Sequence, residues 1–317
     1  MAEIMIVGWD HDKVVIPDLT TSVLARYNPN KPQPYLQEFV EQRKLFTYED
    51  VKKWWNEFGK HKYGRESASG AGPLDHPESL TTVGDVADML TDFLYKMQKP
   101  DGTPIITKEQ TIEAKNYLLR GLTAKQVQEI IEKVPLTKGF EYTFDVFKRA
   151  EITQTLFSDG LGIAVEHQGD RLGFSDYGGV PAKLNAVIKP VHDFFADLLS
   201  EDGVTIFMKD MESLELTGEV GKYDKWEEFF ESIKMDTDAL CDVAVIDDSA
   251  ANIKPMKRIQ NAGGIAIAFN PTDAHFKQFK EAEIPVLKQT EPNLEPFAEI
   301  VLAPESERAD VIRRYCV

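Results

Sequence analysis

Three short stretches, far apart along the chain, carry the residue types that phosphoryl transfer requires. Each follows an apolar run: Asp10 and Asp12 the first, Ser158 and Asp159 the second, and residues 247–252 the third. A carboxylate can attack phosphorus, a second carboxyl can exchange a proton with the leaving oxygen, and a hydroxyl can bind a phosphoryl oxygen. Each stretch alone is common in turns, so the prediction depends on the order of the three.

The charge of the substrate adds a requirement for cations. A phosphate monoester is a dianion and repels a carboxylate nucleophile unless positive charge surrounds the phosphorus. A divalent cation held by Asp10 and Asp248 would neutralise most of that charge, and oxygen ligands of this kind favour Mg²⁺ over zinc. A lysine, Lys222 or Lys225, stands at the start of the predicted helix that leads into the third run and would add a fixed positive charge.

The apolar runs are the elements that must position these residues. Their alternation with helical stretches predicts an α/β fold with a parallel sheet, whose active site lies beyond the carboxyl ends of the strands. Strands are predicted at 4–9, 152–157, 204–208, 243–246, 264–269 and, with weaker patterns, 284–287 and 300–302. A hairpin turn is also predicted at 167–170, and a hairpin near 214–220.

Helical signals dominate the long segment between the first two predicted strands. Thr107 with Gln110, and Thr123 with Gln126, have capping-box spacing, and residues 47–50 precede an amphipathic stretch. A glycine-rich loop spans residues 64–73. We therefore predict two domains: a core of residues 1–15 and 125–317, and a mainly helical domain of residues 16–124.

Composition narrows the class of protein. The net charge of −17 disfavours an extended surface for nucleic acid or anionic membranes, because both are polyanions. No run approaches the roughly 18 apolar residues of a membrane span, and no secretory signal is evident, so a cytoplasmic location is expected. Two cysteines without metal-type spacing indicate ordinary reduced thiols.

The chemistry-bearing stretches resemble the motifs of the haloacid dehalogenase (HAD) superfamily, and more narrowly its phosphoserine-phosphatase-like branch. Asp10-His11-Asp12 resembles motif I, Ser158 resembles motif II, and residues 247–252 resemble motif IV. Longer stretches that also resemble this branch are 121–127 with 135–139, 216–220 and 262–271. The match covers residues 4–15, 120–160 and about 203–275, which is under half of the chain.

The resemblance implies a Rossmann-like core with a parallel sheet and a large helical cap inserted after the first strand. It implies that Asp10 is the nucleophile and Asp12 the general acid and base. Phosphate contacts would come from Ser158, Asp159 and a lysine, for which Lys225 fits the family spacing better than Lys222.

The resemblance also implies a metal site and a cap contact. Mg²⁺ would be held by Asp10, Asp12, Asp248 and Asp247, with Asn252 supporting the site. Arg65, in the glycine-rich loop, is a candidate contact to the leaving group when the cap closes over the site.

Two residues depart from the family pattern. Lys13 stands where a small residue is usual, and it adds bulk and charge beside the nucleophile. Asn252 stands where aspartate is common, which leaves one negative charge fewer near the metal.

Three functions are compatible with these residues. The leading prediction is a Mg²⁺-dependent phosphatase that acts on a small phosphorylated metabolite through an aspartyl-phosphate. A phosphotransferase or phosphomutase would use the same scaffold, and a HAD-like binding or regulatory protein would have little turnover. A homodimer is left open.

Overall fold

The structure is a computed structural model in which two compact units are recognised. The first comprises Met1–Leu19, Ile131–His192 and Thr217–Val317, and the second comprises Thr20–Ile130 and Asp193–Leu216. The domain boundaries predicted from the sequence stay a prediction. The structure describes residues 4–27, 46–59, 89–90, 92–93, 97–107, 110, 122, 124–158, 162–174, 183–185 and 237–317.

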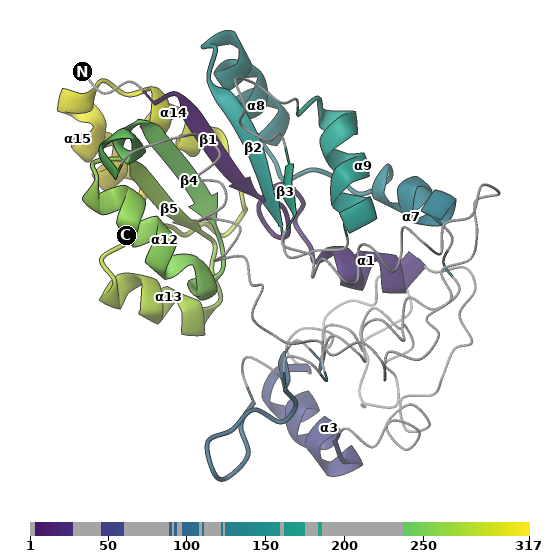
Figure 1. Ribbon diagram of the computed structural model, residues 1–317. Helices are drawn as coiled ribbons and strands as arrows, with labels where there is room; N and C mark the ends of the chain where they lie inside the picture. Colours follow the sequence, from purple (N-terminus) through teal and green to yellow (C-terminus); the bar gives the residue numbers. More distant parts are fainter. Residues whose placement is uncertain are drawn as a thin grey trace. The chain divides into compact units, whose positions relative to one another are not determined.

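A parallel sheet forms the centre of the first unit (Figure 1). Its described strands are β1 (Ile6–Asp10), β2 (Thr153–Ser158), β3 (Lys183–Asn185), β4 (Val243–Asp247), β5 (Ile265–Phe269) and β6 (Val286–Leu287). They lie in the order β3-β2-β1-β4-β5-β6, and every pairing is parallel. This is the doubly wound Rossmann order, in which strands are added outward in opposite directions from β1 and β4.

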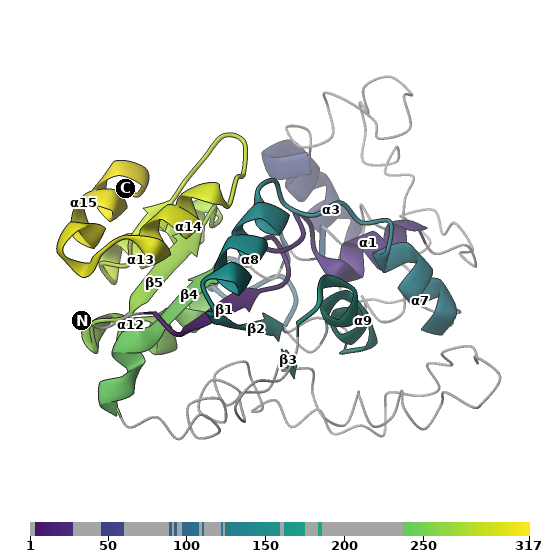
Figure 2. The same cartoon turned by 90° about the horizontal axis from the view of Figure 1, so that it is seen from above.

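Helices cover both faces of this sheet (Figures 1 and 2). One face packs on α12 (Ile253–Asn261) and α13 (Asp273–Glu281), through a buried cluster that includes Val243, Met256 and Phe279. The other face packs on α8 (Phe140–Arg149) and α14 (Glu295–Leu302). Burial on both faces explains why β1, β4 and β5 are entirely buried and mostly apolar.

Trp9 joins the first strand to the helices of the second face. Its ring lies 5.2 Å from that of Phe140, 5.8 Å from Phe147 and 5.4 Å from Phe297, measured between centroids. Its indole N–H donates to Oε1 of Gln154 on β2, at 3.0 Å. The residue before Asp10 is therefore fixed by an aromatic cluster and a buried hydrogen bond.

Further helices complete the described chain. In the second unit, Thr47 caps α3 (Tyr48–Trp54), and its hydroxyl and amide exchange hydrogen bonds with Asp50. Thr107 and Gln110 make the reciprocal bonds expected from their spacing. The remaining helices are α1 (Thr20–Tyr27), α3 (Tyr48–Trp54), a π-helix (Trp55–Gly59), α7 (Ala124–Ile131), α9 (Gly162–Leu172), α15 (Glu305–Tyr315) and two 3₁₀ segments (Thr237–Asp242 and Ala250–Asn252).

Two predicted elements are wrong. Residues 300–302 end the helix α14 rather than forming a strand, because Leu294, Phe297, Ala298 and Val301 recur with helical spacing. Residues 167–170 lie inside α9 rather than in a hairpin turn. The predicted strand 204–208 and hairpin 214–220 lie outside the described residues.

Two further findings in the described residues concern membrane spans and the cysteines. None of the helices in the described part of the chain has the length and apolar character needed to cross a membrane. Cys241 and Cys316 are free thiols, and burial raises the pKa of Cys316 to about 12.

Candidate functional site

The loop after β1 presents the predicted nucleophile. Asp10 is the last residue of β1 and is 5% exposed. The chain then turns back on itself, with the amide of Val15 donating to the carbonyl of Asp10 and the amide of Ile16 to that of His11. The amide of Thr137 donates to the carbonyl of Val15, at 2.9 Å, and ties this loop to the segment before α8.

The loop after β4 presents a second carboxylate in a fixed orientation. Asp247 ends β4, and the amide of Ser249 donates to its Oδ1 at 2.7 Å. The side-chain amide of Asn252 donates to its Oδ2 at 2.9 Å. Both carboxylate oxygens of Asp247 therefore accept a hydrogen bond from their own loop.

The two loops bring three carboxylates together. Oxygen atoms of Asp10, Asp247 and Asp248 all lie within 4.8 Å of one another, and the three residues are buried. Trp9 pairs with Ile246, so the ends of β1 and β4 are adjacent at the point where the strand order reverses. Ligand sites of doubly wound sheets form in the crevice at this reversal.

The charge of this cluster calls for a cation. Two like unit charges about 4 Å apart repel by about 4 kcal/mol at an effective dielectric constant of about 20. Oxygen ligands from three carboxylates are a donor set that Mg²⁺ accepts. Oδ1 of Asn252 is buried without a hydrogen-bond partner, which leaves a further oxygen acceptor on the residue that orients Asp247. The residues present therefore fit a divalent cation.

Asp12 is held beside this cluster by its neighbour. Its Oδ1 lies 2.9 Å from Nδ1 of the buried His11, and its side chain is one-fifth exposed. Among the described residues, its carboxylate is not part of the three-carboxylate group. The Asp12 side chain is therefore partly exposed, and its contact with His11 orients it.

Lys13 brings a positive charge to the same cluster. Its ammonium Nζ lies 3.4 Å from Oδ2 of Asp248, and its side chain is one-third exposed. Burial of this ammonium lowers its pKa, but the carboxylates of Asp248, Asp12 and Asp10 outweigh that effect and raise the pKa above its ordinary value. Lys13 therefore forms an ion pair with Asp248 inside the candidate site.

A histidine that sequence reasoning missed supports the second loop. Nδ1 of His275, near the start of α13, lies 3.3 Å from the carbonyl oxygen of Asp248. Residues 270–275 follow β5, so the rule of inspecting each strand end could have found it. His275 therefore ties the Asp248 loop to α13.

The remaining predicted residues are placed only in part. Ser158 is the last residue of β2, directly after Phe157, which pairs with Asp10 in the sheet. Its backbone therefore reaches the same edge as the nucleophile. Asp159, Lys222, Lys225 and Arg65 lie outside the described residues.

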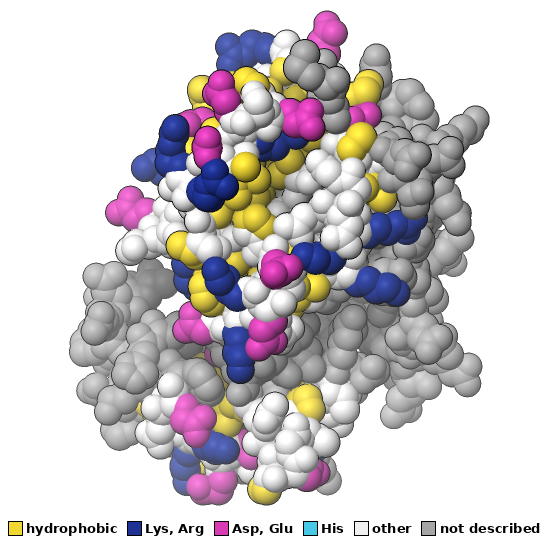
Figure 3. All heavy atoms as spheres, turned by 90° about the vertical axis from the view of Figure 1, so that its left-hand side faces the viewer, with side chains coloured by type: hydrophobic (Ala, Val, Ile, Leu, Met, Phe, Trp, Pro, Cys, Tyr) yellow, Lys and Arg dark blue, Asp and Glu magenta, His cyan; other side chains and the backbone are white. Residues whose placement is uncertain are grey.

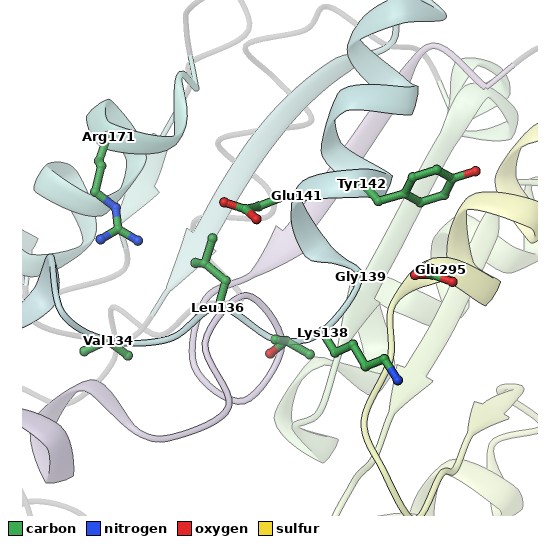
Figure 4. A pocket seen from close by; sticks show the side chains of 9 residues that line it. Val134, Leu136, Lys138, Gly139, Glu141, Tyr142, Arg171 and Glu295 are labelled. Carbon is green, nitrogen blue, oxygen red and sulfur yellow. The ribbon is translucent and has the colours of Figure 1, made fainter.

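A pocket lies beside the loop that carries Thr137 (Figure 4). Its volume is about 450 Å³, and residues from the loop 134–139, the start of α8, Arg171 and Glu295 line it. Charged side chains of both signs line it, and none of the predicted site residues that the structure describes is among them. We therefore place the candidate site at the carboxylates.

Known proteins similar to this chain are found among solved structures. No protein-family model matches the sequence, and no curated protein is significantly similar to it. A substrate-bound phosphoserine phosphatase is 17% identical, with a TM-score of 0.47, over 94% of this chain and 99% of its own. A phosphoserine phosphatase with a phospho-aspartyl intermediate analogue is also 17% identical, with a TM-score of 0.45, over 94% and 98%. A HAD family hydrolase from Deinococcus radiodurans, with bound phosphate and sodium, is 11% identical, with a TM-score of 0.41, over 95% and 97%.

The strand order and the strand-end aspartates identify the fold. The sheet is doubly wound, Asp10 ends its first strand, and the acidic stretch 247–252 begins at the end of the neighbouring strand β4. The core has a doubly wound, Rossmann-like α/β fold. In this core, the stretches that resemble motif I and motif IV of the HAD superfamily meet at the reversal of the strand order.

Proposed function

We propose that this protein is a Mg²⁺-dependent phosphatase that hydrolyses a phosphate monoester of a small metabolite. The proposal rests on one observation: Asp10, Asp247 and Asp248 place carboxylate oxygens within 4.8 Å of one another at the reversal of the strand order. A cytoplasmic location, and the absence of a nucleic-acid or membrane partner, stay part of the proposal.

Asp10 is the nucleophile of the first step. One of its carboxylate oxygens forms a bond to phosphorus while the bond from phosphorus to the leaving oxygen breaks. The product is an aspartyl-phosphate on Asp10 and an alcohol that has gained a proton. Burial of Asp10 and its hydrogen bond from the amide of His11, at 2.9 Å, keep this carboxylate in one orientation.

Asp12 transfers the protons of both steps. In its protonated form it gives a proton to the leaving oxygen, and as a carboxylate it takes a proton from the water that attacks phosphorus. Attack by that water breaks the bond to Asp10 and releases inorganic phosphate. The contact with His11 holds the Asp12 carboxyl group for both transfers.

Mg²⁺ would be held by Asp10, Asp247 and Asp248 and would supply the charge neutralisation that lets a carboxylate approach a dianion. Ser158 and Lys225 are proposed to bind the non-bridging oxygens. Arg65 is proposed to contact the leaving group. The similar structures named as phosphoserine phosphatases support a small phosphorylated substrate.

The test of this function is hydrolysis of a generic aryl phosphate, followed by a panel of phosphorylated metabolites. The native chain should release phosphate with Mg²⁺ and lose activity with a chelator. Asp10→Asn should lower kcat by at least about 10³-fold, because the amide is a poor nucleophile.

A matched variant separates chemistry from folding. Asp145→Asn changes an exposed carboxylate on α8 in the same way and should keep full activity. Inert native protein across the whole panel would reject the phosphatase and favour the binding protein. Phosphoryl transfer to an added alcohol in preference to water would favour the phosphotransferase.

A further inference from the structure

Lys13 is the cation that the structure places against the carboxylate cluster. Its Nζ lies 3.4 Å from Oδ2 of Asp248, which is one of the three clustered carboxylates. The Asp248 side chain is 10% exposed and that of Lys13 33%, so solvent screens this ion pair less than a pair between two fully exposed side chains.

The backbone at Lys13 fixes where the ammonium can reach. Its φ of 63° lies in the left-handed region, which is unfavourable for a residue with a branched or long side chain. Its amide donates to the carbonyl of Asp18, and the loop is closed by the bond from Val15 to Asp10. The side chain therefore starts from a constrained position next to the nucleophile.

The formal charges of the cluster indicate how Lys13 would affect binding of the proposed metal. The carboxylates of Asp10, Asp247 and Asp248 carry three negative charges, and one ammonium reduces the formal charge to −2. A divalent cation at this cluster would bind the Asp248 carboxylate that the ammonium contacts, and it would be repelled by the ammonium itself. Both effects weaken divalent binding.

We propose that Lys13 competes with the divalent cation for Asp248 and thereby sets the metal affinity of the site. Lys13 is a positioning residue in this role, and the inference rests on the metal site of the proposed function. The consequence is a site that holds Mg²⁺ more weakly than its carboxylates alone would.

The test measures metal binding directly. Mn²⁺ is the probe, because it accepts the same carboxylate ligands as Mg²⁺ and its free and bound forms are distinguished by electron paramagnetic resonance. Lys13→Met removes the charge while keeping the length of the side chain, and it should bind Mn²⁺ at least about tenfold more tightly. Lys13→Arg keeps the charge and should stay within about threefold of the native affinity.

Lys257 offers a matched control. Lys257 lies on α12, and its side chain is 32% exposed, against 33% for Lys13. Its Nζ forms an ion pair with Glu283 at 3.7 Å. Lys257→Met should therefore leave Mn²⁺ affinity unchanged. Circular dichroism and thermal melting check each variant, and Lys13→Gln replaces the methionine variant if that one does not fold.

The outcomes decide the inference separately from the enzyme function. Unchanged or weaker Mn²⁺ binding by the uncharged Lys13 variants would overturn the competition, whatever the activity of the native chain. Tighter binding in those variants would support the competition even if no phosphate ester is hydrolysed. Loss of activity in Asp10→Asn, by contrast, reports only on the proposed function.

Discussion

Asn252 is the residue whose amide fixes the orientation of the Asp247 carboxylate. It is fully buried and is the N-cap residue of α12. Its Nδ2 donates to Oδ2 of Asp247 at 2.9 Å. A buried hydrogen bond to a charged acceptor contributes about 1.5–3 kcal/mol to stability. Groups that orient metal ligands are also worth roughly 10- to 100-fold in metal affinity. Asn252 is therefore expected to affect both folding and metal binding.

Replacing Asn252 by alanine tests this role. Asn252→Ala should lower the free energy of unfolding by about 1–3 kcal/mol, because Asp247 loses a buried donor. It should also weaken Mn²⁺ binding by about tenfold or more, because that carboxylate can then rotate. Urea unfolding with a chelator present and Mn²⁺ titration measure the two effects. Asn261→Ala, exposed at the end of the same helix, should change stability by less than about 0.5 kcal/mol.

At the scale of elements, the turn between α12 and β5 lies close against the backbone that leads into β4. Gly264 is the last residue of this turn, and a Cβ atom there would lie 2.3 Å from the carbonyl oxygen of Leu240 and 2.6 Å from that of Val243. These contacts are with backbone that cannot rotate away. The register of β5 against β4, and so the place of the loop carrying Asp248, depends on a residue without a side chain.

Adding one methyl group at this turn is the corresponding test. Gly264→Ala should lower the free energy of unfolding by about 3 kcal/mol or more, because backbone must move to admit the methyl group. Gly263→Ala is the control: its φ of 95° is strained for alanine, but the nearest atom lies 3.7 Å from the new Cβ. That variant should lose only about 1–2 kcal/mol. Equal losses in urea unfolding would contradict the proposed close approach.

At the scale of the whole molecule, electrostatics are set by the excess of acidic residues. The chain has 53 Asp and Glu against 36 Lys and Arg, for a net charge of −17. The face in Figure 3 shows residues of both signs interspersed, so the excess is not a single-sign field there. Long-range repulsion of like charges opposes the compact state and is screened by salt.

Monovalent salt should therefore stabilise the chain. Raising NaCl from about 0.02 M to about 0.5 M, with a chelator present, should raise the melting temperature by roughly 1–2 °C, which corresponds to about 1 kcal/mol for a chain of this length. Differential scanning calorimetry measures the shift. A neutral osmolyte at matched osmolality is the control for effects that do not act through charge. A lower melting temperature in salt would mean that attractive ion pairs outweigh the repulsion.

Most strands of the core could be predicted because a strand covered on both faces must be apolar along its length. β1, β4 and β5 coincide with predicted apolar runs, and β2 coincides with a predicted run that Thr153, Gln154 and Thr155 interrupt. β3 was missed because Lys183-Leu184-Asn185 is three residues long and mostly polar. Residues 300–302 were misassigned because three apolar residues are too few to show a helical period.

For the site, the sequence by itself determined which residue types follow each strand. Because parallel strands end at one edge, this was enough to bring Asp10, Asp247 and Asp248 together. Only the tertiary structure decided that Asn252 holds Asp247 and that the Lys13 ammonium meets Asp248. These are distances between side-chain atoms, and they depend on loop dihedral angles and strand register. The order of residue types along the chain says little about either.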